Sequence, residues 1–475
     1  MTRTDAPTLS VEEVRLYEWP YVLRLPFRFG AITVTHGRQL VVRLRARLAD
    51  GREAWGVAAE ALAAKWFDKN PEFTDDQNLE QLRAAVELAV AAYLAGGRRT
   101  AFGHFAATYR DQLALGARRR LPAIVASFGP AMLDRAVVDA LGKILGGSFY
   151  ALARANALGI EAGALTPDLA GFDMSRFLAS LAPASSIEAR HTVGMVDPIV
   201  AADQTPAERV NDDLPETLEE VVSTYGHRYF KLKVGGNVAA DVARLSKIAA
   251  VLDRAREPYF ATLDGNEQFA DAAGVLELWR AIEATPALAR LRESVLFIEQ
   301  PIKRATALAA DVRVLAAKKP VIVDESDGEL DTFPEARRLG YAGISSKNCK
   351  GLYKSILNAA RCRNWGDCFM SAEDLTTLAG VSVQQDLALV NLIGLTHVER
   401  NGHHFVDGFA GRPAAEARGF LAAHPGLYRE SHGRVRLAIA KGRLALGSLD
   451  CPGFAAGAEL DVSAMEPMLK PSWPG

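Results

Sequence analysis

Charged side chains at the ends of apolar runs are the feature of this sequence that points most directly to chemistry. The run YFKLK ends on Lys231 and Lys233, which lie two positions apart and therefore share one face of a strand. Three later runs end on Asp264, Glu299 and Asp324. Burying such groups without partners costs several kcal/mol, so we expect them to contact a metal ion or one another.

The three carboxylates predict a metal site. Asp264, Glu299 and Asp324 end consecutive predicted strands, and neighbouring strand ends converge at the mouth of a barrel. Three oxygen ligands suit one Mg²⁺ per subunit, with Mn²⁺ as the alternative. A divalent ion that holds a substrate carboxylate stabilises the enediolate formed when the α-proton leaves.

Two lysines flank these carboxylates in the sequence, Lys233 before them and Lys347 after them. This order predicts a base on each side of whatever the metal holds. Lysines crowded by cations have a lowered pKa and act as bases near neutral pH. The pattern therefore indicates metal-assisted proton abstraction next to a carboxylate.

Each motif by itself has an ordinary structural explanation. A KxK pair is commonly a solvated strand edge, and DGN is commonly a turn. Asp264 and Asn266 do not begin an EF-hand, because Phe269 stands where that loop requires glycine. The ordered succession of all the motifs on successive strands favours an active site, and a non-catalytic barrel with a relic metal site is the alternative.

The elements that must position these residues alternate between strand and helix from about residue 191. Eight short apolar strands separated by amphipathic helices predict an α/β barrel of the TIM type. An open doubly wound sheet would need a glycine-rich loop after its first strand, and MVDPIVAADQ is not one. The predicted strands are 191–196, 229–234, 259–264, 294–300, 319–325, 343–347, 367–371 and 392–398.

The two ends of the chain have a residue pattern that differs from the strand–helix alternation of the predicted barrel. Residues 11–61 alternate apolar and polar residues and predict strands, whereas 79–97 and 130–147 have helical spacing and end on Gly-Gly pairs that act as C-caps. The last 45 or so residues again suggest strands. We therefore predict an α+β capping domain in 1–155, a connection in 156–190, the barrel in 191–430, and a C-terminal segment in 431–475 that returns to the cap.

Composition favours a small-molecule partner. The formal net charge is −2, so the sequence lacks the excess of positive charge typical of proteins that bind nucleic acid or an anionic membrane. The N-terminus lacks the apolar run of a signal peptide, and no stretch is apolar enough to span a membrane, so we expect a cytoplasmic protein. Four cysteines without a zinc spacing are expected as reduced thiols, at Cys349, Cys362, Cys368 and Cys451.

The motifs KLKVGGN, TLDGNEQF, FIEQP, IVDES and SKNCKG together resemble the enolase superfamily. The resemblance is to the mandelate racemase/muconate-lactonizing enzyme family, in its muconate-lactonizing-like branch with a lysine base on each face. It covers roughly residues 11–156 and 192–462. It implies a modified (β/α)7β barrel under an α+β cap built from both termini, and a homo-oligomer.

The resemblance also implies roles for individual residues. Asp264, Glu299 and Asp324 would bind Mg²⁺, Lys233 would be the base on one face, and Lys347 the acid or base on the opposite face. Lys231 would tune Lys233 and contact the substrate carboxylate. Cap loops at 25–33 and 64–69 would set specificity. Further substrate-binding candidates are Phe27, Phe29, Trp66, Asn266, Glu325, Glu373 and Glu399, of which Glu373 would line the pocket or hold a lysine.

Some features depart from better-known members. The seventh strand, ending MSAEDL, has no histidine at Ser371 or Ala372, so a His–Asp dyad is not supported. The eighth, with THVERNG, lacks the paired aspartates of dipeptide epimerases. A lysine on each face favours a racemase or epimerase, and a lyase (dehydratase) or cycloisomerase using the same site is the alternative. Extra length at 94–120, 156–190 and 402–430 receives no functional explanation.

Overall fold

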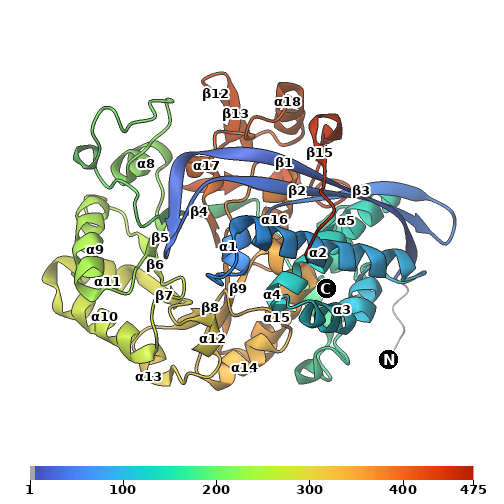
Figure 1. The fold of residues 1–475 in the computed structure, drawn as a ribbon, viewed down its shortest axis with the longest axis horizontal. Coiled ribbons are helices and arrows are strands. Elements are labelled where there is room, and N and C mark those ends of the chain that lie inside the picture. The colour runs from blue at the N-terminus through green and yellow to red at the C-terminus, as the bar shows by residue number, and fades with distance from the viewer. Residues whose placement is uncertain (1–5, 474–475) are drawn as a thin grey trace.

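The computed structural model describes residues 6–473 and contains a closed parallel barrel beneath a strand-rich cap (Figure 1). The barrel strands follow one another in chain order, and the last pairs with the first, which closes the ring. The predicted eight-stranded barrel is therefore confirmed. Its strands are β4 (Ser186–Val193), β5 (Tyr229–Lys233), β6 (Phe260–Asp264), β7 (Val295–Glu299), β8 (Val321–Val323), β9 (Gly343–Ser346), β10 (Phe369–Ala372) and β11 (His397–Arg400).

Amphipathic helices connect the strands and cover the outside of the barrel. Several begin at side-chain caps; Thr217, for example, accepts from the backbone N–H of Glu220. The helices are α8 (Leu218–Tyr225), α9 (Val238–Leu252), α10 (Ala272–Ala284), α11 (Ala289–Ser294), α12 (Arg304–Ala307), α13 (Arg313–Ala316), α14 (Thr332–Arg338), α15 (Leu352–Trp365) and α16 (Val381–Leu392). After β11 come only the short α17 (Gly402–Phe405) and α18 (Ala414–Ala423) before the tail.

The cap is an antiparallel sheet covered by helices. Strands β1 (Leu9–Phe29), β2 (Ile32–Leu48) and β3 (Glu53–Ala61) pair in order, and α5 (Phe128–Leu145) packs on β2 and β3. A Cβ at Gly56 would lie 1.9 Å from the carbonyl oxygen of Ala136, so only glycine lets α5 approach β3 this closely. The other cap helices are α1 (Ala64–Phe67), α2 (Asp75–Ala95), α3 (Ala101–Arg118), α4 (Ala123–Ala126) and α6 (Phe149–Arg154).

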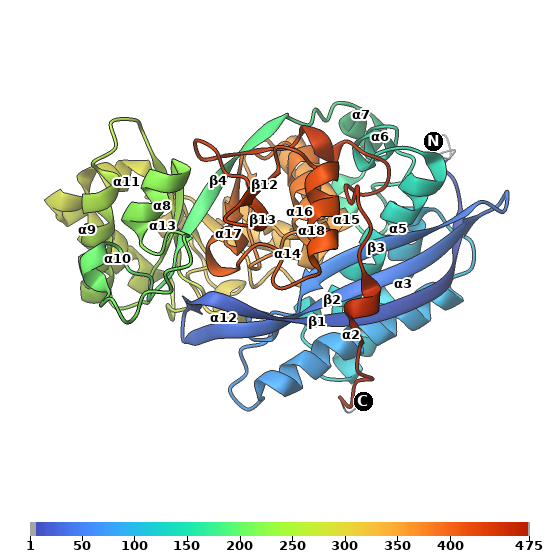
Figure 2. The same ribbon diagram turned by 90° about the horizontal axis from the view of Figure 1, so that it is seen from above.

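The structure differs from the predicted boundaries in three places. The first barrel strand begins at Ser186, inside the predicted connection, which also contains α7 (Met174–Ala179). Residues 27–29 and 32–33 are the paired end of the β1–β2 hairpin, with its turn at Gly30 and Ala31, and this hairpin extends toward the barrel in Figures 1 and 2. Leu392 ends α16 and residues 393–395 form the turn that follows rather than the start of β11, because Gly394 takes a positive φ that terminates the helix.

The C-terminal segment contacts both parts of the molecule. A hairpin of β12 (Tyr428–Ser431) and β13 (Arg434–Leu437) precedes β14 (Arg443–Ala445), which pairs with barrel strand β4. Only then does β15 (Glu466–Pro467) pair with β1 of the cap. Short 3-10 turns complete the elements at Pro167–Leu169, Ala201–Asp203, Pro286–Leu288, Asn348–Lys350, Gly447–Leu449 and Val462–Ala464.

The segments of extra length are ordered parts of the fold. Helix α3 packs on α2 and α5 within the cap. Asp168, in the predicted connection, binds the guanidinium of Arg361 on α15 at 2.8 Å. The ring of Phe405 on α17 contacts that of Phe27 at the end of the β1–β2 hairpin, with the ring centroids 4.5 Å apart and the planes tilted. This last contact joins the cap to the barrel.

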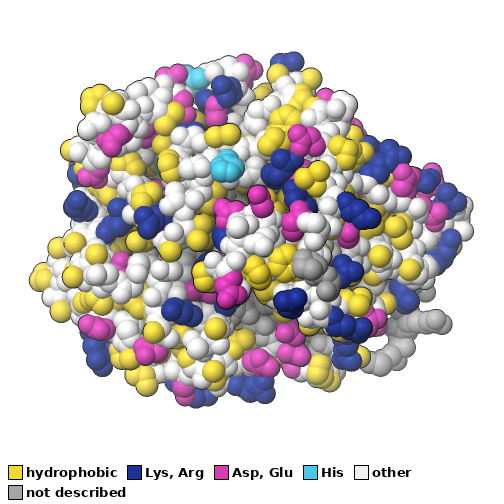
Figure 3. Space-filling view, in the orientation of Figure 1, with side chains coloured by type: hydrophobic (Ala, Val, Ile, Leu, Met, Phe, Trp, Pro, Cys, Tyr) yellow, Lys and Arg dark blue, Asp and Glu magenta, His cyan; other side chains and the backbone are white. Residues whose placement is uncertain are grey.

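Basic and acidic side chains alternate over the visible face of the described residues in Figure 3. Within residues 6–473, no helix is long and apolar enough to cross a bilayer. The four cysteines are free thiols.

Candidate active site

Barrel register brings the predicted strand-end residues side by side. Lys233 at the end of β5 is opposite Asp264 at the end of β6, and Asp264 is opposite Glu299 at the end of β7. Asp324 directly follows β8. All are buried, as is Lys347 just after β9. The tertiary structure therefore gathers at one end of the barrel residues that are far apart in the sequence.

The ammonium group of Lys231 lies among four carboxylates. Its Nζ donates to Glu373 at 2.7 Å and to Glu299 and Glu399 at 2.9 Å each, and it lies 2.9 Å from Asp264 Oδ2. Lys231 is 1% exposed. Burial lowers its pKa, but the carboxylates outweigh burial and the net pKa lies well above the ordinary value. Lys231 is thus a fixed cation in this structure.

The four carboxylates around Lys231 carry more charge than the side chains that neutralise them. Lys233 donates to Asp264 at 2.6 Å, and Arg190 contacts Glu373, so three cations face four anions. The pKa of Glu299 is raised well above its ordinary value, first by burial and then by Asp264 and Glu373. Its Oε2 accepts no well-aligned hydrogen bond among the residues described. This excess of buried oxygen ligands fits a divalent cation of the Mg²⁺ type.

A second cluster forms around Asp324. Lys347 donates to Asp324 Oδ2 at 2.7 Å, and Lys350 Nζ lies 3.4 Å from Oδ1. Burial would raise the pKa of Asp324, but these lysines outweigh it and hold the pKa far below the ordinary value. Lys350 was not among the predicted site residues. The signal for it was present, since SKNCKG carries a second lysine three residues after Lys347.

Lys347 has a raised pKa in this arrangement. Burial lowers the pKa, but Asp324 outweighs burial, so the net pKa is raised. The reason is that the nearest neighbour of the ammonium is a carboxylate rather than a cation. The lowering of the pKa by neighbouring cations, which is expected from the sequence, stays a prediction.

Lys233 and Lys347 open on one cavity from opposite sides. Their strands, β5 and β9, are separated by three strands in either direction around the eight-stranded ring. Both residues line a cavity of about 520 Å³. Each ammonium also lies over an aromatic ring from the cap: Lys233 is 5.9 Å from the ring of Phe27, and Lys347 is 4.2 Å from that of Trp66.

The cavity is apolar toward the cap and polar toward the barrel. The predicted wall residues Phe27, Phe29 and Trp66 line it, and so do Asn266 and Glu399 on the barrel side. Lining residues that the sequence reasoning missed include Tyr21, Leu23, Ile32, Val34, Asp374 and Asn401.

Two predicted substrate-binding residues do not line this cavity. Glu325 accepts from Asn266 Nδ2 at 3.0 Å and from Lys69 at 3.1 Å. Glu373 is held by Lys231 and Arg190, which agrees with the reading that it holds a lysine. Their carboxylates are engaged by these internal partners, and contact of either residue with a substrate stays a prediction. Arg190 was missed because it lies within β4, away from any strand end.

Comparison with known proteins supports one family. Residues 213–427 match the family model described as enolase C-terminal domain-like. The muconate lactonizing enzyme of Mycobacterium smegmatis, solved with muconolactone, has a TM-score of 0.62 and 19% identity over 96% of this chain and 99% of that one. Curated proteins provide no match.

Two further solved structures share the fold. An enolase from Bradyrhizobium, complexed with magnesium and mandelic acid, has a TM-score of 0.57 and 17% identity, with 97% of this chain and 99% of that one covered. An enolase-superfamily member from Roseovarius nubinhibens, complexed with magnesium, has a TM-score of 0.58 and 16% identity with the same coverage. Residues 213–427 of this chain thus match the enolase C-terminal domain-like family, and 96–97% of the chain shares the fold of these enolase-superfamily and muconate lactonizing structures.

Proposed function

We propose that this enzyme removes the proton α to the carboxylate of a small-molecule acid and returns it on the opposite face, as a racemase or epimerase. The observation that carries the proposal is the position of Lys233 and Lys347 on strands at opposite sides of the barrel, both lining one cavity. Transfer of a proton from one face of a carbon to the other requires a base on one side and an acid on the other.

Asp264, Glu299 and Asp324 would hold a Mg²⁺ ion in this enzyme. Support comes from their shared strand-end position, from the excess of carboxylates, and from the magnesium named for two structures of the same fold. When bound, the ion would polarise the substrate carboxylate and offset the charge left by the departing proton, and by competing for Asp324 it would lower the raised pKa of Lys347.

The lysines of this chain supply the proton transfer itself. Lys233 in its neutral form accepts the α-proton at Nζ, and Lys347 as an ammonium donates a proton from Nζ to the other face. In the reverse direction the roles exchange. The aromatic rings of Phe27 and Trp66 cover these amines and exclude water from them. Exclusion of water strengthens each electrostatic interaction in the cavity.

Lys231 acts as a positioning residue in this proposal. It lines the cavity, but its ammonium is engaged by four carboxylates. We expect it to hold Asp264 and Glu299 in place rather than to exchange a proton with the substrate. Contact with the substrate carboxylate, the role first expected for it, would require one of these ion pairs to open.

The cavity also favours one class of substrate. A hairpin end rich in phenylalanine, leucine and branched aliphatic residues forms the side facing the cap. The charged groups lie at the opposite, barrel end. We therefore propose a carboxylic acid whose carboxylate faces the barrel and whose apolar or aromatic substituent faces the cap.

Hydrogen exchange in D₂O tests this proposal. Chiral carboxylic acids with apolar substituents are incubated with Mg²⁺ and protein, and mass spectrometry detects deuterium at the α-carbon. We expect exchange and inversion with the native enzyme, and loss of exchange from one enantiomer in Lys233→Met and from the other in Lys347→Met.

The control is Lys303→Met, which changes an exposed lysine beyond β7. If both site variants exchange as fast as the control, the two lysines are not the bases and the proposal fails. Loss of water or ring opening without inversion would identify a lyase (dehydratase) or cycloisomerase that uses the same residues.

A further inference from the structure

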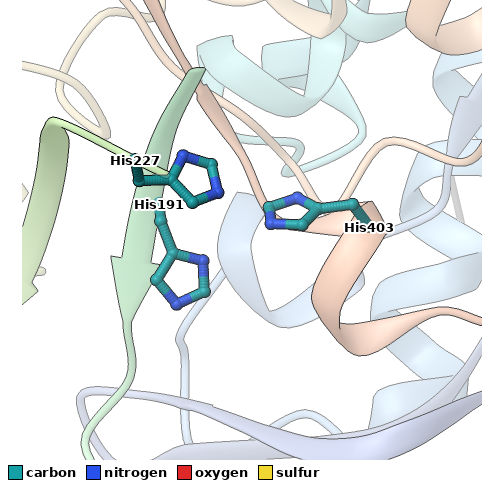
Figure 4. Close-up of side chains that lie close together, drawn as sticks. All are labelled: His191, His227 and His403. Carbon is teal, nitrogen blue, oxygen red and sulfur yellow. The ribbon is translucent and has the colours of Figure 1, made fainter. Parts of the chain in front are cut away.

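Three histidines from separate segments meet in a second cluster. His191 lies on β4, His227 just before β5, and His403 on α17. Figure 4 shows the ring of His403 directed at the other two. One ligand atom from each lies within 4.8 Å of the other two, and the three ring centroids are 5.4–5.5 Å apart. The rings therefore form a nearly equilateral triangle.

The cluster is separate from the candidate active site. Thr192 directs its hydroxyl to Glu399, a residue that lines the active-site cavity. Neighbouring residues of a strand point to opposite faces, so His191 faces the other side of the barrel wall. Neither His227 nor His403 lines the active-site cavity. The catalytic proposal therefore does not explain the cluster.

Packing alone leaves the histidine nitrogens unsatisfied. His191 Nδ1, His227 Nε2 and both ring nitrogens of His403 are inaccessible to water and have no hydrogen-bond partner between residues 6 and 473. A buried polar group without a partner costs about 1–3 kcal/mol. Phenylalanine would fill the same space without this cost, so the choice of three histidines requires a ligand.

The protonation of these rings is already suited to a cation. His227 Nδ1 lies 2.9 Å from the carbonyl oxygen of Ala189, which can only accept. Nδ1 therefore carries the proton, and the lone pair of Nε2 remains for the cluster. Burial lowers the pKa of all three histidines, to about 4 for His227, so each ring is neutral at pH 7.

We propose that His191, His227 and His403 bind one transition-metal ion, with Zn²⁺ as the first choice. Imidazole nitrogen suits Zn²⁺, Cu²⁺ and Ni²⁺, whereas Mg²⁺ prefers oxygen, so the two sites select different ions. Zinc bonds of about 2.0–2.1 Å to three imidazoles place ring centroids about 5 Å apart, close to the observed triangle. The ligand nitrogens lie within 4.8 Å of one another here and would close to about 3.3 Å apart around a tetrahedral ion.

The surroundings leave room for a fourth ligand. His403 borders a small cavity of about 30 Å³, which also meets Tyr225 and Arg400. This volume accommodates about one water molecule. Arg429 and Arg436 also line this cavity. The two arginines whose charge adds to burial in lowering the pKa of His403 are neutralised, since Arg24 pairs with Asp212 and Arg400 with Asp374 and Asp386. Their charge therefore opposes a bound cation only weakly.

Binding would tie together segments that lie far apart in the chain. β4, the start of β5 and α17 meet at the point where β11 pairs with β4 and closes the barrel. An ion held by all three segments would stabilise this closure. The proposal rests on the histidine geometry and does not depend on the catalytic proposal.

Calorimetry with Zn²⁺ tests the site. The protein is freed of metal with a chelator and saturated with Mg²⁺, so that the carboxylate site is occupied, and Zn²⁺ is then added. We expect one equivalent to bind. His403→Gln should weaken the Zn²⁺ Kd about 100-fold or more. The exposed-histidine variant His36→Ala/His432→Ala should leave the Kd unchanged.

Spectroscopy of the unmutated protein provides an independent measurement. Cu²⁺ added to the Mg²⁺-saturated protein should give an electron paramagnetic resonance spectrum with hyperfine coupling to three nitrogens. Absence of a stoichiometric Zn²⁺ site overturns the proposal. So does loss of binding in the exposed-histidine variant instead of His403→Gln, or coupling to fewer than three nitrogens.

Discussion

Replacing Lys231 by methionine should be one of the most destabilising single changes in the barrel. The side chain is of similar length, so packing is kept, but four buried carboxylates lose a shared cation. Asp264 retains Lys233 and Glu373 retains Arg190, whereas Glu399 retains no other ion pair among the described residues. Burial raises the pKa of Glu399, but Lys231 and the cations around it outweigh burial and hold the pKa well below the ordinary value. Removing one partner of a buried ion pair costs about 3–5 kcal/mol, and we expect a loss in the free energy of unfolding of that size.

Urea denaturation without Mg²⁺ measures this loss, and a double-mutant cycle assigns it. Lys231→Met/Glu399→Gln should recover part of the lost stability, because the second change removes the unpaired charge. Lys303→Met, at an exposed position, should change stability by less than about 0.5 kcal/mol. If Lys231→Met matches this control, or if the double variant is no more stable than the single one, Lys231 does not neutralise the strand-end carboxylates.

Three other changes test different parts of the structure. Burial raises the pKa of Glu60 to about 7, so the ionised form is disfavoured in the folded state and stability falls as pH rises from 4.5 to 7. Glu60→Gln should therefore become more stable than the native protein as the pH rises through this range, by up to about 3 kcal/mol. Urea unfolding at each pH measures this. If the difference in unfolding free energy between the two proteins stays the same at every pH, the raised pKa is contradicted. Gly56→Ala should lower the free energy of unfolding by about 1–3 kcal/mol through the clash with Ala136, whereas Gly51→Ala, where a Cβ has open space but φ is positive, reports the backbone effect alone. Trp66→Ala should slow deuterium exchange about tenfold for the enantiomer served by Lys347, with Trp66→Phe recovering most of it; equal slowing of both enantiomers would argue against a specific contact with Lys347.

Local sequence pattern predicted the barrel and the residues at its mouth. Three short apolar runs end on Lys233, Asp264 and Glu299. Each run predicts a strand, and its charged last residue predicts which end of the barrel that residue faces. This works because in parallel α/β barrels the carboxyl ends of all strands meet at one end. The order of the strands in the chain is therefore enough to predict that these groups lie close together.

Other site features depend on distances that the chain order does not contain. The internal pairing of Glu325 with Asn266 and Lys69, and of Glu373 with Arg190, reflects which partners fold closest in a crowded, water-poor interior. For the same reason the pKa of Lys347 is raised, since its nearest neighbour is Asp324. Each outcome is decided by differences of one or two ångströms between competing partners.

What the sequence by itself determined is thus the order of strands, the family motifs and the types of residue at the strand ends. Only the tertiary structure decided that the β1–β2 hairpin covers the cavity and that His191, His227 and His403 meet. These contacts join segments that lie far apart in the chain through the closure of β11 on β4 and the return of α17 to the cap. No local periodicity encodes such contacts, because they arise when surfaces formed independently by hydrophobic burial are brought together.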